Sequence, residues 1–172
     1  MVPAGSNVNA PGVPIGGGGF PPPGGYLPSV DVMPGTALTA ATSMVRWHVG
    51  LEALSTMVTV TADYLKKAIP EGSFRSWLAC DNGRVVAGGA VVIVQWPAHA
   101  YDLECRRATI LNVYTEPEYR RRGVARQIME TMTTWCREEG FGRVSLHASE
   151  YGRPLYESLG FVDSNEMRLN LR

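Results

Sequence analysis

The stretch ILNVYTEPEYRRRGVA, residues 110–125, holds three local patterns in succession. Its first part is rich in β-branched, aromatic and apolar residues, which predicts a strand over 107–115. Pro117 ends this strand, because a proline has no N–H group to give to a ladder. A tight basic turn follows, and a helical pattern then runs from Gly123 to about Glu139, where Gly140 closes it.

A strand, a glycine-containing turn and a helix together suit the binding of a phosphate group. The first N–H groups of a helix have no partner inside it, and the helix dipole places positive partial charge there. Gly123 and Ala125 have little bulk, so an anion can approach the backbone around Val124 closely. Charge and forked donors come from the arginines of this segment: Arg120, Arg121, Arg122 and Arg126.

The spacing Arg120-x-x-Gly123-x-Ala125 resembles the Q/R-x-x-G-x-G/A signature of the GNAT superfamily of N-acetyltransferases, which bind acetyl-CoA. A second stretch, LYESLGF at 155–161, resembles the LYxxxGF ending of the same family. The clear resemblance covers roughly residues 74–171. It implies an α/β fold with a mixed, largely antiparallel central sheet, flanked by helices and with strands splayed at the cofactor site.

The resemblance also implies how acetyl-CoA, the acetyl donor, is held. The backbone of residues 121–126 would bind the pyrophosphate. The main chain of the segment Val113, Tyr114 and Thr115 would bind the pantetheine arm as if it were another strand. This requires the strand at 110–115 to splay from the strand at 144–148.

Two further positions of the family pattern differ in this chain. Ser149 stands where many members carry an asparagine near the pantetheine, so we expect a shorter contact group there. Gly152 stands where alanine is common, which we expect to be a minor change. The segment before residue 74 matches the family only loosely, and the amine acceptor is therefore not identified.

Tyr156 matches the family position that faces the sulfur, and the resemblance makes it the general acid. A tyrosine is protonated at neutral pH and can donate a proton to a departing thiolate. An alkyl amine is neutral in only roughly one molecule in 2,500 at pH 7, so the reaction also needs a proton acceptor. Attack would be direct, because Cys80, Cys105 and Cys136 all lie outside the matched motifs.

The sequence leaves the general base open. The candidates are Glu116, Glu104, Asp102, Glu150, His147, and Asn112 acting through an ordered water. His147 lies between Leu146 and Ala148, and the alternation of a strand turns it toward the other face of the sheet.

The composition narrows the classes of function. The chain has 172 residues and a formal net charge of zero, so no overall field attracts nucleic acid or an anionic membrane. The number of cysteines is odd and they include no C-x-x-C pair, so we expect the protein in the reducing cytoplasm. The histidines show no metal-ligand spacing. No apolar run approaches a membrane span, and no secretory signal pattern begins the chain.

The chain divides into a Gly/Pro-rich tail at 1–28 and a single domain at 29–172. The tail is expected to be flexible, or else to dock its few apolar residues on the domain or on a second subunit. The remaining elements are predicted as a strand at 29–33 before a turn at Pro34, a helix at 36–58, a helix at 62–69 capped by Thr61, strands at 74–80, 84–96 and 141–148, a short helix from Pro154 to Gly160, and a closing hairpin at 161–162 and 167–171. Residues 81–83 are predicted as a hairpin turn, and the adjacent Gly88 and Gly89 indicate a bulge or a close backbone approach.

These observations predict an N-acetyltransferase that acts on a small-molecule or protein amine. The alternative is a GNAT-like module that binds an acyl-CoA as a sensor without turnover. Nucleic-acid binding through the arginine turn is disfavoured, because no aromatic platform accompanies the charge. Pairing of two chains as a homodimer is a further expectation.

Overall fold

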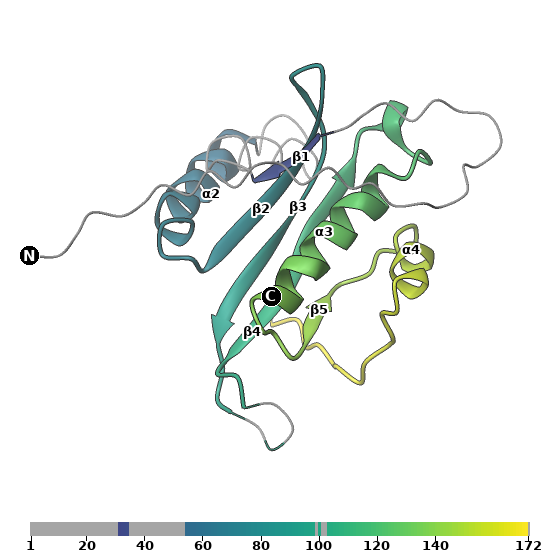
Figure 1. The fold of residues 1–172 in the computed structure, drawn as a ribbon. Coiled ribbons are helices and arrows are strands. Elements are labelled where there is room, and N and C mark those ends of the chain that lie inside the picture. Colours follow the sequence, from purple (N-terminus) through teal and green to yellow (C-terminus); the bar gives the residue numbers. More distant parts are fainter. Residues whose placement is uncertain (1–30, 35–53, 99, 101–102, 172) are drawn as a thin grey trace, which may run out of the picture.

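The computed structural model describes residues 31–34, 54–98, 100 and 103–171, and Figure 1 shows one sheet with helices on both of its faces. The described elements are β1 (Asp31–Pro34), α2 (Leu54–Ala68), β2 (Phe74–Asp81), β3 (Arg84–Gln95), β4 (Arg106–Thr115), the short 3-10 helix η1 (Pro117–Tyr119), α3 (Val124–Glu138), β5 (Val144–Leu146) and α4 (Arg153–Ser158). The sheet order follows the chain from β1 to β5. β1 to β4 pair antiparallel and β5 pairs parallel to β4, so the predicted mixed, largely antiparallel α/β fold is confirmed.

β2 and β3 form a hairpin around Asn82 and Gly83, as predicted. Both residues have positive φ, 48° and 78°, which a two-residue hairpin turn of this kind requires. On the outer side of β2, β1 extends through Pro34, which was predicted to lie in a turn. The proline is tolerated there because β1 is the edge strand of the sheet that the described residues form, so its outward side needs no N–H donor for a further described strand.

Neighbouring residues of β3 point to opposite faces of the sheet, and each face is covered by its own helix. Ala90 packs with Leu65 of α2 and Phe74 in one buried cluster. Val91 belongs to the larger cluster that includes Met132 of α3. The sheet is therefore the middle layer of three, with α2 and α3 on opposite sides (Figure 1).

α3 and α4 end in the same way. The N–H of Phe141 donates to the carbonyl of Cys136 at 3.0 Å, and the N–H of Phe161 donates to the carbonyl of Tyr156 at 3.0 Å. The glycine before each phenylalanine has a φ of 80° or 90°. This is the Schellman motif, in which a left-handed glycine lets the chain turn back and satisfy the last helical carbonyls.

The prediction of two separate helices before residue 70 was wrong where it can be compared. α2 runs without a break through Thr61, which is an interior residue and not a cap. The β-branched run at 58–61 lowers helix propensity, but burial of Leu65 and Ala68 against the sheet outweighs it. The tail at 1–28 and most of the helix predicted at 36–58 lie outside the described residues.

The C-terminal third also differs from the prediction. β5 is shorter than the strand predicted at 141–148, because Phe141 closes α3 and β5 pairs with β4 at only three positions. The closing hairpin is wrong, since residues 161–171 contain no strand. The alternating side chains of Met167, Leu169 and Leu171 suit a strand, but all are exposed.

Candidate functional site

β4 and β5 separate part of the way along β4. The two strands pair only from Ala108 opposite Val144 to Ile110 opposite Leu146. β4 then continues to Thr115, while the chain after β5 turns away to α4 (Figure 1). We call this separation the wedge, and it has the splayed strands that the family resemblance implies.

The main chain of β4 inside the wedge alternates between two directions. The N–H of Glu116 donates to the carbonyl of Val86 at 2.9 Å, so Glu116 faces β3. Because successive residues of a strand direct their N–H and C=O groups to opposite sides, the main chain of Thr115 faces away from β3. Thr115 therefore presents its amide groups to the wedge, and the same role of Val113 stays a prediction.

A β-bulge lies where the wedge begins. Leu111 pairs with Ala90 and Tyr114 pairs with Gly88, so Asn112 and Val113 both lie opposite Gly89. Asn112 has a φ of 54°, which is uncommon for a residue other than glycine. The bulge predicted from the glycine pair is confirmed, and it increases the local twist at the point where β4 leaves β5.

Gly89 also permits a close approach of α3. A Cβ atom on Gly89 would lie 2.8 Å from Cε of Met132 and 3.2 Å from Cγ2 of Ile128. Both side chains are fully buried. The absence of a side chain at Gly89 therefore lets the middle of α3 pack against the backbone of the sheet.

The corner, residues 117–126, joins β4 to α3. Arg121 and Gly123 have φ of 59° and 82°, so the chain turns sharply before the helix begins. Gln127 is the first residue to donate into α3, to the carbonyl of Gly123 at 3.0 Å. Within the described part of the chain, no backbone carbonyl or capping side chain accepts from the N–H groups of residues 121–126.

The arginines of the corner have different surroundings. Arg120 donates from Nε to the carbonyl of Thr115 at 2.9 Å, and its guanidinium lies 5.4 Å from the centre of the Tyr114 ring. Arg122 lies 5.6 Å from the centre of the Tyr119 ring. The side chain of Arg120 thus closes the corner onto β4 and occupies one of the Thr115 groups that face the wedge.

Arg126 connects the two sides of the wedge. Its Nη2 donates to Oγ of Ser158 at 2.7 Å, which links the first turn of α3 to the last turn of α4. The same side chain lies 3.7 Å from Glu130, one helical turn later. Arg121 has an exposed side chain and no ion pair within the described residues. The contact of all these arginines with a cofactor stays a prediction.

One buried polar atom of this region has no partner. Oγ1 of Thr115 is enclosed without a hydrogen bond, although a buried hydroxyl normally has one. Thr115 is the last residue of β4 and lies beside the corner. A ligand amide or phosphate in the wedge fits the needs of this hydroxyl and of the unpartnered corner amides.

Tyr156 lies on α4, which follows β5 and therefore approaches the wedge from the side opposite β4. Its side chain is 9% exposed and belongs to the same buried cluster as Val124, with Val113 packed against that cluster. Burial raises the pKa of the Tyr156 hydroxyl above its ordinary value, because the charged phenolate is poorly solvated there. The predicted acid is therefore a proton donor over the whole neutral range.

Ser149 and Gly152 position this tyrosine. Oγ of Ser149 accepts from the N–H of Gly152 at 3.1 Å, and the carbonyl of Ser149 accepts from the N–H of Arg153 at 2.9 Å, so Ser149 holds the turn that leads into α4. A Cβ atom on Gly152 would lie 2.8 Å from Cε2 of Tyr156. The ring therefore fills the space that an alanine methyl group would need at this position.

The candidate bases are scattered. Glu116 and Asn112 are half-buried at the end of β4 and at the bulge. Glu104 lies 3.6 Å from Arg106, and His147 lies 3.9 Å from Glu166, both pairs being largely exposed. Glu150 is exposed, and Asp102 lies outside the described residues. His147 and Asn112 are the candidates nearest in sequence to the point where β4 and β5 separate, because they follow the last paired residues, Leu146 and Ile110, by one and two positions.

Sequence reasoning missed four residues around the corner. Oη of Tyr119 donates to Oδ2 of Asp81 at 2.6 Å, and Nη2 of Arg84 donates to Oε1 of Glu118 at 2.7 Å. Asp81 and Arg84 flank the β2–β3 turn, 38 and 34 residues away from their partners. No local pattern could reveal these contacts, since they depend on the register of β3 against β4.

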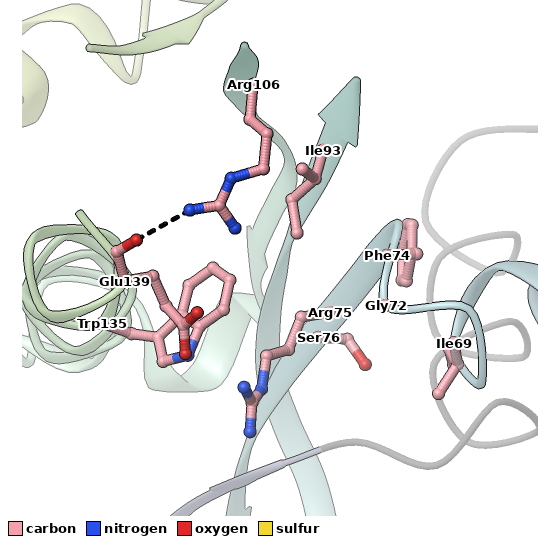
Figure 2. Close-up of a pocket in the computed structure, with 9 residues that line it drawn as sticks. All are labelled: Ile69, Gly72, Phe74, Arg75, Ser76, Ile93, Arg106, Trp135 and Glu139. Carbon is pink, nitrogen blue, oxygen red and sulfur yellow. Dashed lines mark hydrogen bonds between the residues drawn. The ribbon is translucent and has the colours of Figure 1, made fainter. Parts of the chain in front are cut away.

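A hollow of about 370 Å³ lies at the opposite end of α3 from the corner (Figure 2). Arg75 lies 5.0 Å from the centre of the Trp135 ring, and Arg106 donates to the carbonyl of Glu139 at 3.0 Å. Ile69 and Phe74 provide apolar lining. We place the candidate site at the wedge and not here, because the unpartnered amides and the buried Thr115 hydroxyl lie at the wedge.

The described residues contain neither a candidate metal-binding cluster nor a candidate membrane-spanning helix. No group of three or more His, Cys, Asp or Glu side chains in these ranges could hold a metal ion. No helix among them has the length and apolar character needed to cross a membrane.

Comparison with known proteins gives consistent matches. Residues 46–161 match the model of the acetyltransferase (GNAT) family. Human N-acetyltransferase 8 is 26% identical over 114 residues, which cover 64% of this chain and 48% of that protein. The chain therefore spans about half the length of this curated relative.

Solved structures share the fold. A GCN5-related N-acetyltransferase from Ralstonia eutropha JMP134 superposes with a TM-score of 0.73 at 26% identity, covering 83% of this chain and 98% of the other. A predicted acetyltransferase with acetyl-CoA from Clostridium acetobutylicum gives 0.74 at 22% identity, covering 83% and 96%. The match to the family model, the superposed fold, the wedge and the corner agree, and this chain belongs to the GNAT family of acetyltransferases.

Proposed function

We propose that the chain is an N-acetyltransferase that moves the acetyl group of acetyl-CoA to a primary amine of a small molecule or a protein. The observation that carries the proposal is the wedge, whose open strand edge adjoins the unpartnered corner amides. Acetyl-CoA combines a diphosphate with a long arm that contains amides, so it can use both features. The acetyl-CoA named for the Clostridium structure supports the proposal.

Different groups of the chain bind different parts of acetyl-CoA. The N–H groups of residues 121–126 receive the diphosphate, and the exposed Arg121 adds charge there. The main chain of Val113, together with the N–H of Thr115, receives the amides of the arm. Ser149 contributes to the site by fixing the start of α4.

Acetyl-CoA supplies an acetyl group activated as a thioester. The neutral amine attacks the acetyl carbonyl, the new C–N bond forms, and the C–S bond breaks. The proton lost by the amine passes to water or to a base. The hydroxyl of Tyr156 donates a proton to the departing sulfur, and its raised pKa keeps that proton in place until it is needed.

Calorimetric titration with CoA tests the binding half of the proposal. We expect a saturable heat at one site per chain. The same titration with Arg121→Ala should give weaker binding, because one charge at the diphosphate is removed. A folded parent protein that releases no heat at high micromolar concentration would contradict the proposal.

Replacement of Tyr156 by Phe tests the catalytic half. The change removes one hydroxyl and keeps the ring, so packing against Phe161 is retained. We expect kcat to fall roughly a hundredfold, as for loss of a general acid, while CoA binds as before. A panel of amines with detection of the released thiol supplies the acceptor for this measurement.

The second candidate function is an acyl-CoA sensor without turnover. It is favoured by the surroundings of the candidate bases, since Glu104 and His147 lie near oppositely charged or acidic partners at the surface. A parent protein that binds CoA but releases no thiol with any amine of the panel would support the sensor over the enzyme.

Location and assembly stay predictions from the sequence. We propose a cytoplasmic protein, no nucleic-acid partner, and a homodimer. Sedimentation at high concentration tests the homodimer, and a monomer would contradict it. Titration with duplex DNA at low salt tests the absence of a nucleic-acid partner. If the arginine turn did bind DNA, its affinity would fall steeply as salt is added.

A further inference from the structure

We infer that Asp81 and Arg84, at the tip of the β2–β3 hairpin, are positioning residues for the corner and act through Tyr119 and Glu118. The inference rests on the proposed function, because it assigns to these residues the placement of the amides that receive the diphosphate. None of the four residues belongs to the matched family motifs.

The first contact joins the hairpin to the end of η1. Oη of Tyr119 donates to Oδ2 of Asp81 at 2.6 Å, and the bond is partly buried. The Tyr119 ring packs against the main buried cluster, so the tyrosine is held at its base and at its tip. Asp81 is itself fixed by Nδ2 of Asn82 at 3.0 Å, in a turn with two left-handed residues.

The second contact joins the same two elements, the β2–β3 hairpin and η1. Nη2 of Arg84 donates to Oε1 of Glu118 at 2.7 Å. Both side chains are about half exposed, 59% and 48%, so this pair alone contributes little to stability. Its role is geometric, because two bonds from neighbouring hairpin residues to neighbouring residues of η1 define a direction as well as a distance.

The corner needs such support because its own backbone bonds are few. Within the described residues, the N–H groups of Tyr119 and Arg120 donate to Glu116 and Pro117, at 2.9 and 3.2 Å, and those of residues 121–126 are left over. Closely spaced arginines repel one another in this segment. Side-chain bonds to a rigid neighbour therefore determine where the free amides point.

Tyr119, which is bonded to Asp81, also contacts an arginine of the corner. The Arg122 guanidinium lies 5.6 Å from the centre of the Tyr119 ring, a cation–π arrangement. A tyrosine that lost its bond to Asp81 would therefore release Arg122 as well as η1. Asp81, by contrast, has no need to touch a bound ligand in order to affect its binding.

Tyr119→Phe and Asp81→Ala, singly and together, test the inference. Each single change should raise the CoA dissociation constant roughly three- to tenfold, the equivalent of one lost hydrogen bond, and leave kcat unchanged. The double variant should be no weaker than either single one, because both changes remove the same bond. Tyr64→Phe, on the helix that covers the other face of the sheet, is the matched control and should bind as the parent does.

Hydrogen–deuterium exchange of the free protein gives a second readout that needs no ligand. Tyr119→Phe should increase exchange in residues 117–124, with the strands and α2 unchanged. Unchanged exchange at the corner, or additive losses of CoA affinity in the double variant, would overturn the inference. If the parent binds no CoA, the proposed function fails, and the exchange result alone decides whether Asp81 holds the corner.

Discussion

Tyr156 illustrates how the surroundings of one residue determine its chemistry. Burial raises the pKa of its hydroxyl above about 10, so the neutral phenol is favoured in the folded chain. A raised pKa stabilises the fold below the unfolded value of about 10, and this contribution is lost as the pH rises through the folded value. Between about pH 7 and 9 Tyr156 therefore stays protonated while the amine substrate loses its proton.

We accordingly expect kcat/KM to rise with pH over this range and to show no loss assignable to Tyr156 below about pH 10. The measurement is a pH profile of the parent and of Tyr156→Phe with one amine. The two profiles should run parallel, displaced by the loss of the acid. The expectation would be contradicted if kcat/KM of the parent fell as the pH rose near neutrality and this fall were absent in Tyr156→Phe. The hydroxyl would then ionise at a much lower pH than its burial requires.

Gly152 carries a second prediction at this scale. Gly152→Ala places a methyl group 2.8 Å from the Tyr156 ring, and the contact is too short to persist, so the ring must move. We expect kcat to fall at least tenfold, because a proton donor loses efficiency when displaced. CoA affinity, measured by calorimetry, should change little. An unchanged kcat would mean that the ring position tolerates the shift.

Single residues of the candidate site were predicted from the sequence where they lie in a continuous motif, and their roles stay predictions. Tyr156, Gly123 and the corner arginines are recognised because their spacing belongs to a continuous motif. Asp81 and Glu118 were missed, since each acts through a partner more than thirty residues away. The close approach of Tyr156 to Gly152 could not be predicted for the same reason, because the space beside Gly152 is defined only by the packed Tyr156 ring.

At the scale of elements, the glycine that begins α3 can be compared with the one that ends it. Gly123 and Gly140 have φ of 82° and 80°, and a Cβ atom would meet nothing within 4 Å at either. Replacement by alanine should cost about 1 kcal/mol of stability in each case. Only Gly123→Ala should also weaken CoA binding, because its methyl group stands among the corner amides.

Urea unfolding and CoA titration of the two variants measure these effects together. Gly140→Ala serves as the control for backbone strain without proximity to the wedge. Equal CoA affinity in both variants would show that the diphosphate does not approach the corner at Gly123.

The contact between β3 and α3 gives a further element-scale prediction. Met132→Ala should destabilise the fold by about 2–5 kcal/mol through a cavity, and Gly89→Ala by about 1–3 kcal/mol through overpacking. In the double variant the new methyl group occupies part of the cavity, since it would lie 2.8 Å from Cε of Met132. The combined loss in urea unfolding should therefore be smaller than the sum, and full additivity would contradict the packing described here.

Elements whose pattern and turn chemistry agree were predicted well from the sequence. The hairpin at Asn82 and Gly83 and the bulge at Gly89 are local features, and both are present. α2 was divided wrongly because its β-branched run is compensated by burial that no local pattern shows. The hairpin predicted at 161–171 failed because alternating apolar residues form a strand only when a neighbouring strand accepts them.

At the scale of the whole molecule, binding of CoA in the wedge should increase the stability of the fold. A ligand that binds only the folded chain at a hundred times its dissociation constant adds about 2.7 kcal/mol to the free energy of unfolding. For a domain of this size we expect CoA to raise Tm by roughly 5–10 °C. Pantetheine lacks the diphosphate and should give a smaller shift at equal concentration. Equal Tm shifts by CoA and pantetheine would contradict binding of the diphosphate at the corner.

The three rungs between β4 and β5 have a geometric consequence for the reaction. The groups proposed to hold the donor lie on β4 and α3, whereas the Tyr156 hydroxyl is carried by the chain that follows β5. The hydroxyls of Thr109 and Ser145 lie 3.0 Å apart on the middle rung. If the proposed function holds, the distance between the thioester sulfur and the Tyr156 hydroxyl is set by paired residues that touch neither, and altering these pairs would change the reaction rate while leaving affinity unchanged.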